Sequence, residues 1–260
     1  MKIIVCIKQV PDTTEVKLDP KTGTLIRDGV PSIINPDDKS GLEAALRIKD
    51  EIGAHITVLT MGPPQAEAAI REAFAMGADR GILLTDRAFS GADTWATSST
   101  LAAAIKELEY DLVIAGRQAI DGDTVQVGPQ IAEHLNLPQV SYVEDLKLDG
   151  DRIILKRVFE DRYHTVRVTT PCLITTIKEL NEARYMSVGG IYDAYNSKEV
   201  EVWNLNNIHV DMENIGLKGS PTKVKKSFTK GAKTAGKVFV VDAKEAAEII
   251  VDKLKEKYMI

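Results

Sequence analysis

The residues of this chain best suited to chemistry lie in one polar segment near its middle, residues 116–129. It reads Gly-Arg-Gln-Ala-Ile-Asp-Gly-Asp-Thr-Val-Gln-Val-Gly-Pro and follows a short apolar run. If a helix begins at its end, backbone N–H groups and the helix dipole would favour an anion such as a phosphate. Thr124 is a candidate cap for that helix, and Asp121 or Asp123 could accept hydrogen bonds from ribose hydroxyls or an adenine amino group. The residue types fit a simpler interpretation equally well, in which Asp121 and Gly122 form a tight turn and Asp123 and Thr124 only cap the helix.

Alternating strands and helices are expected to position this segment. Four short runs rich in Ile, Val and Leu are typical of buried strands, namely Lys2–Gln9, His55–Met61, Arg80–Leu84 and Asp111–Ala115. The segments between them carry apolar residues at helical spacing, for example Ala66, Ala69, Ile70, Ala73 and Phe74. Connections of this length imply crossovers between parallel strands. We therefore predict a doubly wound, mostly parallel α/β sheet of the Rossmann-like, adenine-nucleotide-binding kind.

A ligand in such a sheet binds beyond the carboxyl ends of the strands, where the strand order reverses beside the first strand. The loops after the first, second and fourth strands should therefore meet, and their main chain should supply most contacts. The predicted cofactor-binding residues are Cys6, Asn35, Pro36, Asp37, Asp38, Met61, Gly116, Arg117, Gln118, Ala119, Ile120, Asp121, Gly122, Asp123, Thr124, Val125, Gln126 and Val127. Cys6 is expected to contribute backbone and packing and no thiol chemistry, because it lies in a buried apolar run.

The second half of the chain has a different pattern. Arg152–Val158 and Thr165–Thr169 predict an antiparallel ribbon added to the sheet, followed by a buried strand at Cys172–Ile177. Residues 178–236 have weak periodicity and scattered glycines, which favours an arm that reaches a partner. A closing helix begins after Asp242. We expect a nucleotide- or flavin-binding domain over residues 1–180, a partner-wrapping arm over 181–236, and a closing helix within 237–260 that packs on the domain or on the partner.

Composition excludes several function classes. The formal net charge is −5, so bulk charge gives no reason to expect nucleic acid. No apolar stretch approaches the roughly 20 residues of a membrane helix, and a cytoplasmic chain without a leader is expected. The two cysteines and four histidines show no metal-ligand spacing. The chain has no G-x-x-x-x-G-K-[ST] or G-x-G-x-x-G motif, which disfavours P-loop enzymes and ordinary Rossmann dehydrogenases, and nothing nominates a catalytic side chain.

The polar segment belongs to a longer set of matching stretches. Ala119–Thr124 followed by Gln126–Pro129 resembles the nucleotide loop of the electron transfer flavoprotein β subunit, and the likeness covers essentially the whole chain. It includes Val5–Lys8, Asn35-Pro36, Met61–Pro63, Ala75–Gly81, Lys156-Arg157 with Glu160, Pro171–Thr175 and Asn181–Tyr185. The chain departs from the family at Arg162, Tyr163 and His164, where a glycine and then an acidic residue are usual, and at Ala183, where proline is common. These departures affect the ribbon and the start of the arm.

The resemblance implies a heterodimer in which an α subunit carries the electron-transferring FAD. The present subunit would hold either a structural AMP or a second FAD, which in bifurcating members takes a hydride from NADH. The loop, with Val125 and Val127 where AMP-holding members carry bulkier polar residues, looks more like the FAD-holding branch. The implied function is an electron carrier that bifurcates electrons from NADH to ferredoxin or flavodoxin and to an acyl-CoA dehydrogenase. A non-bifurcating subunit with structural AMP that docks dehydrogenases, and a non-redox nucleotide-binding regulator, remain alternatives.

The start of the arm is expected to dock the acyl-CoA dehydrogenase or a similar flavoenzyme. We expect Gly189-Gly190 to form a pliable bend with apolar and aromatic side chains around it, as a protein–protein anchor needs. The predicted docking residues are Tyr185, Met186, Val188, Gly189, Gly190, Ile191 and Tyr192. In the competing interpretation these side chains pack on the protein's own sheet or on the α subunit.

Overall fold

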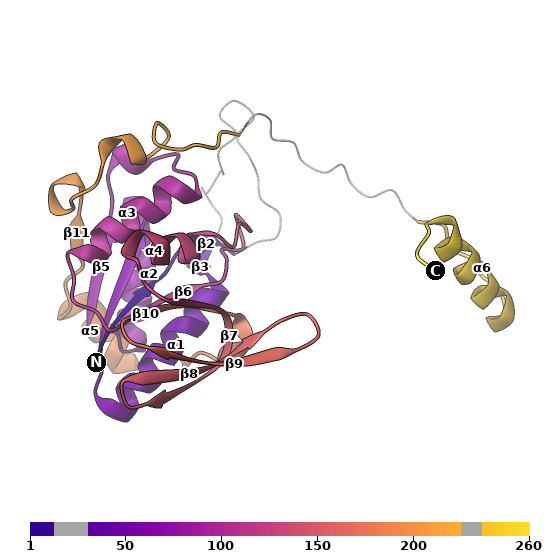
Figure 1. Cartoon of the computed structure of the whole chain (residues 1–260), viewed down its shortest axis with the longest axis horizontal. Coiled ribbons are helices and arrows are strands. Elements are labelled where there is room, and N and C mark those ends of the chain that lie inside the picture. Colours follow the sequence, from indigo (N-terminus) through magenta and orange to yellow (C-terminus); the bar gives the residue numbers. More distant parts are fainter. Residues whose placement is uncertain (13–30, 225–235) are drawn as a thin grey trace. The chain divides into compact units, whose positions relative to one another are not determined.

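The computed structural model of the chain describes residues 1–12, 31–224 and 236–260 (Figure 1). The chain divides into two compact units, Met1–Val224 and Lys225–Ile260. The first unit contains the sheet.

A nine-stranded sheet forms the centre of the first unit, counted over its described residues. The strand order is β11-β5-β4-β1-β6-β10-β7-β8-β9 (Figure 1). Its strands are β1 (Lys2–Cys6), β4 (His55–Met61), β5 (Arg80–Leu84), β6 (Leu112–Gly116), β7 (Gln139–Asp149), β8 (Arg152–Val158), β9 (Tyr163–Thr169), β10 (Cys172–Thr176) and β11 (Glu201–Trp203). Neighbouring strands are parallel from β11 to β7, and β7, β8 and β9 form an antiparallel ribbon. The short strands β2 (Gln9–Pro11) and β3 (Ser32–Ile34) pair separately with each other.

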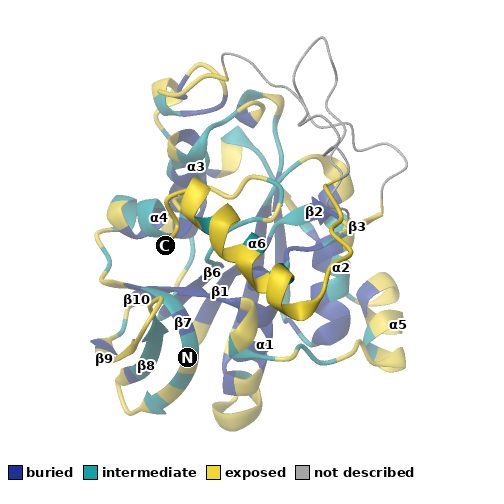
Figure 2. Ribbon diagram, turned by 90° about the vertical axis from the view of Figure 1, so that its right-hand side faces the viewer, coloured by how far each residue is buried: buried dark blue, intermediate teal, exposed yellow. Residues whose placement is uncertain are grey.

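Helices cover both faces of the sheet, as the doubly wound prediction requires. Successive side chains of a strand point to opposite faces, so Ile3 and Val5 of β1 join one apolar core while Ile4 and Cys6 join the other. The first core is completed by α1 (Pro36–Ile52), α2 (Glu67–Met76) and α5 (Val188–Asn196). The second core is completed by α3 (Thr94–Lys106) and α4 (Val127–Leu135). Figure 2 shows the buried strands between these helices. The α/β fold class is therefore confirmed.

The ribbon contains one strand that the sequence pattern did not reveal. The expected pieces Arg152–Val158 and Thr165–Thr169 are β8 and most of β9, but β7, whose residues Val143–Asp149 pair with β8, was not predicted. The register of β7 shifts between Val143 and Asp145, and Tyr142 has a left-handed φ of 60°. A bulge of this kind interrupts the alternation of apolar and polar residues that identifies a strand in sequence.

Residues 178–224 differ from the irregular arm expected there. They contain α5, the edge strand β11, and the short 3-10 helices η3 (Lys178–Leu180), η4 (Leu205–Asn207) and η5 (Met212–Asn214). Two further 3-10 helices, η1 (Pro64–Ala66) and η2 (Arg87–Phe89), lie earlier in the chain. Strand β11 pairs in parallel with β5, and Arg80 binds both oxygens of Glu201 at 2.6 and 2.7 Å. The compact unit therefore continues to Val224, beyond the expected boundary at residue 180. The sequence did not predict these elements because they are too short to show a clear periodicity.

The second unit contains α6 (Ala243–Glu256). It begins after Asp242, as expected, because the Asp242 carboxylate accepts the N–H groups of Lys244 and Glu245 at 2.9 and 3.0 Å. No residue of α6 is buried within this unit. Whether the helix packs on the first unit or on a partner stays a prediction, and the part of the expected arm at 225–235 lies outside the described residues.

Candidate functional site

The strand order places the predicted site where the topology requires it. Strand β1 lies between β4 and β6 and is parallel to both, with Cys6 opposite Leu59 on one side and Ala115 on the other. The strand order therefore reverses beside β1, and the carboxyl ends of β1, β4 and β6 meet at one edge of the sheet, which we call the carboxyl edge. The loops that begin at Lys8, Gly62 and Arg117 all leave from this edge.

A buried aspartate ties two of these strand ends together. The Asp38 carboxylate accepts the backbone N–H of Lys8 at 2.8 Å and that of Gly116 at 3.0 Å. An added Cβ at Gly116 would lie 2.0 Å from Asp38 Oδ1, so only glycine allows this approach. Burial raises the pKa of Asp38 to about 7. The structure thus gives this carboxylate a role in shaping the carboxyl edge, while a direct contact with a cofactor stays a prediction.

Asn35 joins the start of α1 to the loop of residues 116–127. Its side-chain amide donates to the carbonyl of Gln118 at 2.8 Å, and its side-chain oxygen accepts the N–H of Ile120 at 3.1 Å. Asn35 is fully buried. The structure therefore brings together two of the predicted stretches, Asn35–Asp38 and the 116–127 loop, although about 80 residues separate them in the chain.

Two side chains at the same place keep polar atoms without a hydrogen bond. Arg117 Nε lies 3.3 Å from Asp37 Oδ2 as an ion pair, yet neither atom has a hydrogen-bond partner within the described ranges. Burial raises the pKa of Asp37, and the charge of Arg117 opposes that rise. Buried polar atoms of this kind are usually satisfied in the functional state of a protein, which is consistent with a polar ligand at this edge.

The 116–127 loop contains the tight turn of the simpler interpretation, and it also contacts another loop. The N–H groups of Gly122 and Asp123 donate to the Ala119 carbonyl at 3.1 and 2.9 Å. The Asp121 carboxylate accepts from Lys8 Nζ at 2.7 and 2.9 Å and is almost completely buried. Lys8 was not among the predicted site residues, although its position directly after the first buried strand is the signal that could have identified it.

The expected cap on α4 is wrong. Asp123 and Val125 have left-handed φ values of 48° and 57°, so the chain turns twice before α4 starts at Val127. Thr124 lies too early to cap the helix, and the N-cap residue is Gln126, which makes no side-chain cap hydrogen bond. Instead, Gln126 Oε1 accepts from the Thr94 hydroxyl at 2.8 Å. The first N–H groups of α4 are therefore not capped by a side chain of the loop.

The burial of Cys6 agrees with the role predicted for it. Its thiol is buried at the carboxyl end of β1, and burial raises its pKa to about 12. A thiol with this pKa stays protonated near neutral pH and is a poor nucleophile.

The predicted docking residues lie on and just before a helix, which corrects the expected pliable bend. Gly189 and Gly190 are in the first turn of α5, where the Ser187 hydroxyl accepts the N–H of Gly190 at 2.9 Å. A Cβ on Gly190 would be 2.3 Å from the Ala75 carbonyl oxygen, whereas a Cβ on Gly189 would meet nothing within 4 Å. Gly190 therefore allows α5 to pack closely on α2.

The other side of this segment is exposed. Tyr185 and Val188 are 96% and 87% exposed, and Met186, Ile191 and Tyr192 are also exposed. We call these five residues the docking face. Within the first unit the side chains of Tyr185, Val188 and Tyr192 are largely exposed, and whether a partner or the α subunit covers them stays a prediction.

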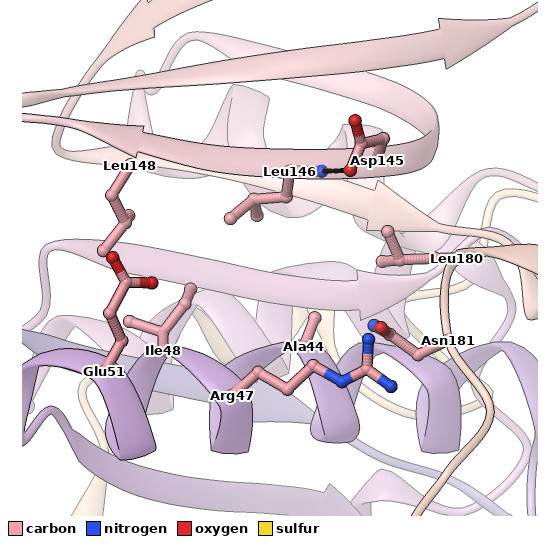
Figure 3. Close-up of a pocket in the computed structure, with 9 residues that line it drawn as sticks. All are labelled: Ala44, Arg47, Ile48, Glu51, Asp145, Leu146, Leu148, Leu180 and Asn181. Atoms are coloured by element: carbon pink, nitrogen blue, oxygen red, sulfur yellow. Dashed lines mark hydrogen bonds between the residues drawn. The ribbon is translucent and has the colours of Figure 1, made fainter.

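A cavity of about 140 Å³ lies elsewhere, between α1 and β7 (Figure 3). Ala44, Ile48, Leu146, Leu148 and Leu180 supply its apolar lining, and Arg47, Glu51, Asp145 and Asn181 supply the polar side chains. None of these residues belongs to the predicted cofactor set. In the part of the chain that the structure describes, no cluster of three or more His, Cys, Asp or Glu side chains could hold a metal ion. None of the helices over residues 1–12, 31–224 and 236–260 has the length and apolar character needed to cross a bilayer.

Comparison with known proteins gives matches along the whole chain. The family model described as electron transfer flavoprotein domain matches residues 22–207. The chain is 62% identical over 260 residues to the electron transfer flavoprotein subunit beta of Clostridium acetobutylicum. It is 57% identical over 263 residues to the caffeyl-CoA reductase-Etf complex subunit CarD of Acetobacterium woodii, and 49% identical over 269 residues to the acryloyl-CoA reductase electron transfer subunit gamma of Anaerotignum propionicum. Each alignment covers 100% of both chains.

Proposed function

Because this chain belongs to the electron transfer flavoprotein family as a β subunit, we propose that it holds FAD at the carboxyl edge and docks a dehydrogenase through α5. Proteins of this kind work in electron transfer and pair with an α subunit. The observation that carries the proposal is the convergence of Lys8, Asn35 and the 116–127 loop at the point where the strand order reverses.

The residues at the carboxyl edge fit an adenine nucleotide. The first turn of α4 offers N–H groups that no loop side chain caps, and its dipole favours a phosphate. The left-handed residues Asp123 and Val125 turn the main chain just before that helix start. Arg117, which is paired with Asp37 at 3.3 Å, adds a cationic side chain at the same edge. AMP and FAD share an adenosine and a first phosphate, so these features support either nucleotide.

Two observations favour FAD with bifurcation over structural AMP. Valine occupies positions 125 and 127, which leaves the loop without the bulkier polar residues expected in AMP-holding members. One relative is named as a subunit of a caffeyl-CoA reductase-Etf complex and another as an acryloyl-CoA reductase electron transfer subunit. Both names therefore refer to a reductase that acts on a CoA thioester. When bound, FAD would accept a hydride from NADH and donate single electrons. The acceptors would be ferredoxin or flavodoxin and an acyl-CoA dehydrogenase.

In this proposal the chain itself supplies binding and orientation. Asp38 holds the ends of β1 and β6 together, Asn35 fixes the middle of the 116–127 loop, and Lys8 pairs with Asp121. These contacts keep the main chain of the site in place.

The nucleotide content of the intact heterodimer tests the cofactor assignment. FAD and AMP are released with acid and quantified against the protein concentration, and the heterodimer is then titrated with NADH. Two FAD molecules per heterodimer, with reduction by NADH, is the result expected for the bifurcating form. One FAD and one AMP would instead support the non-bifurcating alternative, and the absence of flavin would support the non-redox regulator.

The docking assignment is supported by the way α5 is held. Arg71 of α2 donates to the carbonyls of Ala194 and Lys198, and its guanidinium lies 5.3 Å from the ring centre of Tyr195. With the close approach at Gly190, these contacts fix one side of α5 and leave the docking face exposed. A fixed helix with exposed aromatic and aliphatic side chains is suited to anchor a partner, since little order has to be gained on binding.

The double variant Val188→Ala, Ile191→Ala tests this surface. With an acyl-CoA dehydrogenase, its acyl-CoA substrate and a terminal dye, we expect the KM for the heterodimer to rise at least about tenfold, because the variant loses two aliphatic side chains that the partner would bury on binding. Flavin content should not change. The control is Val202→Ala, which truncates an exposed valine on β11 that does not belong to the docking face. A fall in flavin content in the double variant would show that these residues support the fold, and the docking assignment would be wrong.

A further inference from the structure

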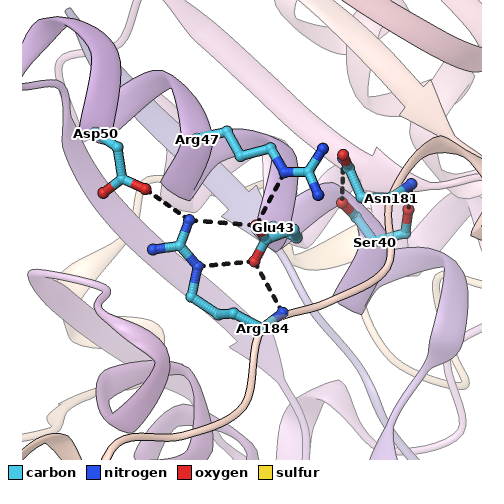
Figure 4. A network of polar contacts seen from close by, with 6 residues as sticks. All are labelled: Ser40, Glu43, Arg47, Asp50, Asn181 and Arg184. Carbon is cyan, nitrogen blue, oxygen red and sulfur yellow. Dashed lines mark hydrogen bonds and ion pairs between the residues drawn. The ribbon is translucent and has the colours of Figure 1, made fainter.

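The segment that leads from β10 to α5 is fixed to the side of α1 by a cluster of polar side chains (Figure 4). It joins residues of α1 to residues about 140 positions later in the chain. The members are Ser40, Glu43, Arg47 and Asp50 of α1, together with Asn181 and Arg184. The docking face begins one residue after Arg184, so this cluster fixes the chain immediately before the docking face.

Glu43 is the centre of the cluster. Its side chain is only 4% exposed. One carboxylate oxygen accepts the backbone N–H of Arg184 at 3.1 Å and its Nε at 2.9 Å, and the other accepts Arg184 Nη2 at 3.2 Å and Arg47 Nε at 3.0 Å. Burial alone would raise the pKa of Glu43, but the hydrogen bonds from Arg184 and Arg47 outweigh it and hold that pKa below its usual range. The carboxylate therefore holds both the backbone and the side chain of Arg184.

Neighbouring contacts fix the same segment on either side of Glu43. Arg184 Nη2 also donates to Asp50 Oδ2 at 2.7 Å, about two helical turns further along α1 than Glu43. Asn181 donates its backbone N–H to the Ser40 hydroxyl at 3.1 Å and its side-chain amide to the Ser40 carbonyl at 3.3 Å. Charge-assisted and bidentate hydrogen bonds of this kind define an orientation as well as a contact. The segment is thus held at two points, at residues 181 and 184.

We infer that Glu43 is a positioning residue for the dehydrogenase-docking surface, acting through Arg184. The inference rests on the proposed docking role of α5. Glu43 itself lies under the segment, and no atom of it belongs to the docking face. Its carboxylate sets where the chain leaves α1, and Tyr185, Met186 and Val188 follow directly. Without the charged pair, residues 185–188 can leave the docking-competent arrangement, and the affinity for the partner falls by the fraction of molecules that do so.

Arg47 provides a matched control. It donates to the Glu43 oxygen that also accepts Arg184 Nη2, and it lies on the same helix as Glu43. Among the described residues it makes no hydrogen bond to residues 181–184, and its side chain is 57% exposed. Arg47→Gln therefore removes a partner of Glu43 without releasing the segment. Glu43→Gln keeps the shape of the side chain and removes its charge, and Arg184→Gln removes the partner through which Glu43 is inferred to act.

The experiment uses the intact heterodimer with the acyl-CoA dehydrogenase and dye assay. For Glu43→Gln we expect the KM for the heterodimer to rise roughly three- to tenfold, as when the competent arrangement falls to a third or a tenth of the molecules. The kcat at saturation should stay within about twofold of the wild-type value. The flavin content should not change. Hydrogen exchange should become faster in peptides from residues 184–196 and stay the same in peptides from β1 and β6. Arg47→Gln should match the wild type, and Glu43→Gln, Arg184→Gln should be no worse than Arg184→Gln alone.

Three results would overturn the inference. The first is an unchanged KM in Glu43→Gln together with a raised KM in the Val188→Ala, Ile191→Ala variant. This result would support the docking surface and would show that Glu43 does not position it. The second is additive effects of Glu43→Gln and Arg184→Gln, which would show that Glu43 does not act through Arg184. The third is an unchanged KM in both the Glu43 variant and the docking-face variant, in which case the docking assignment fails and the inference with it. If Glu43→Gln does not fold, Arg184→Lys, which keeps the charge and loses the bidentate geometry, is used in the same tests.

Discussion

Replacing Gly116 by alanine tests how closely the carboxyl edge is built. The added Cβ would lie 2.0 Å from Asp38 Oδ1, 2.8 Å from the Asp38 nitrogen and 3.0 Å from Asp37 Cβ. Two of these three atoms are not at the end of a flexible side chain, so the first turn of α1 has to move away from β6. A shift of about 1 Å or more is needed to restore ordinary contact distances. Such a shift would break the 3.0 Å hydrogen bond from Gly116 to Asp38.

The expected loss of stability has two parts. Forcing an extra carbon into a packed site costs about 1–3 kcal/mol, and losing a hydrogen bond to a charged group costs about 1.5–3 kcal/mol. Together they give a destabilisation of about 2.5–6 kcal/mol. At about 2–4 °C per kcal/mol for a unit of this size, the Tm should fall by roughly 5–24 °C.

The control is Gly122→Ala in the same loop, where an added Cβ meets nothing within 4 Å. Alanine there restricts the unfolded chain and should change stability by about +0.4 to +1 kcal/mol, so the Tm should stay the same or rise slightly. The assay is thermal unfolding of the intact heterodimer at one scan rate, with hydrogen exchange of the Lys8 amide as a local probe of the contact with Asp38. A Tm for Gly116→Ala within about 2 °C of the wild type would show that α1 and β6 are not packed as described.

Three further outcomes are expected. Because burial raises the pKa of Cys6 to about 12, its thiol should resist iodoacetamide at pH 8 in the folded protein, and Cys6→Ser should retain electron transfer; rapid labelling of the native protein would contradict this. The folded-state pKa of Glu43 lies below its ordinary value of 4.5, so its ionised form stabilises the protein above that pH and the contribution is lost as the pH falls through the lowered pKa. Acid unfolding curves of wild type and Glu43→Gln should therefore converge at low pH, and a constant difference between them down to pH 2 would refute the assignment. The double variant Asp121→Ala, Asp123→Ala should lose nucleotide without unfolding, as measured by nucleotide content and far-UV circular dichroism, and full retention of nucleotide would remove both residues from the site.

The parts of the fold predicted correctly are those with a clear pattern of apolar and polar residues in the sequence. His55–Met61 and Arg80–Leu84 are strands with the predicted bounds, because each is a short apolar run with a sharp polar or glycine boundary. The reversal of strand order beside β1 followed from the alternation of strands and helices alone. Strand β7 could not be recognised, because its bulge and the left-handed Tyr142 disturb the period of two.

The candidate site shows the same division. Topology predicted that the loops at this edge meet, and the structure does bring Asn35 beside the 116–127 loop, while the binding of a cofactor there stays a prediction. The partners of single side chains did not follow, since they depend on contacts between distant residues. Lys8 with Asp121 and Glu43 with Arg184 are 113 and 141 residues apart. The two glycines at 189 and 190 favoured a bend by propensity, but packing of α5 on α2 makes that turn helical.

Adjacent glycines in α5 have consequences for how partner choice can evolve. Position 190 accepts no side chain because the Ala75 carbonyl is against it, whereas position 189 and most of the docking face are open to substitution. Mutations can therefore change the exposed residues of α5 one at a time, while the close contact of Gly190 with Ala75 keeps α5 packed on α2. Under the proposed docking role of α5, a β subunit built in this way can acquire a different redox partner through surface substitutions that leave the packing of α5 on α2 unchanged.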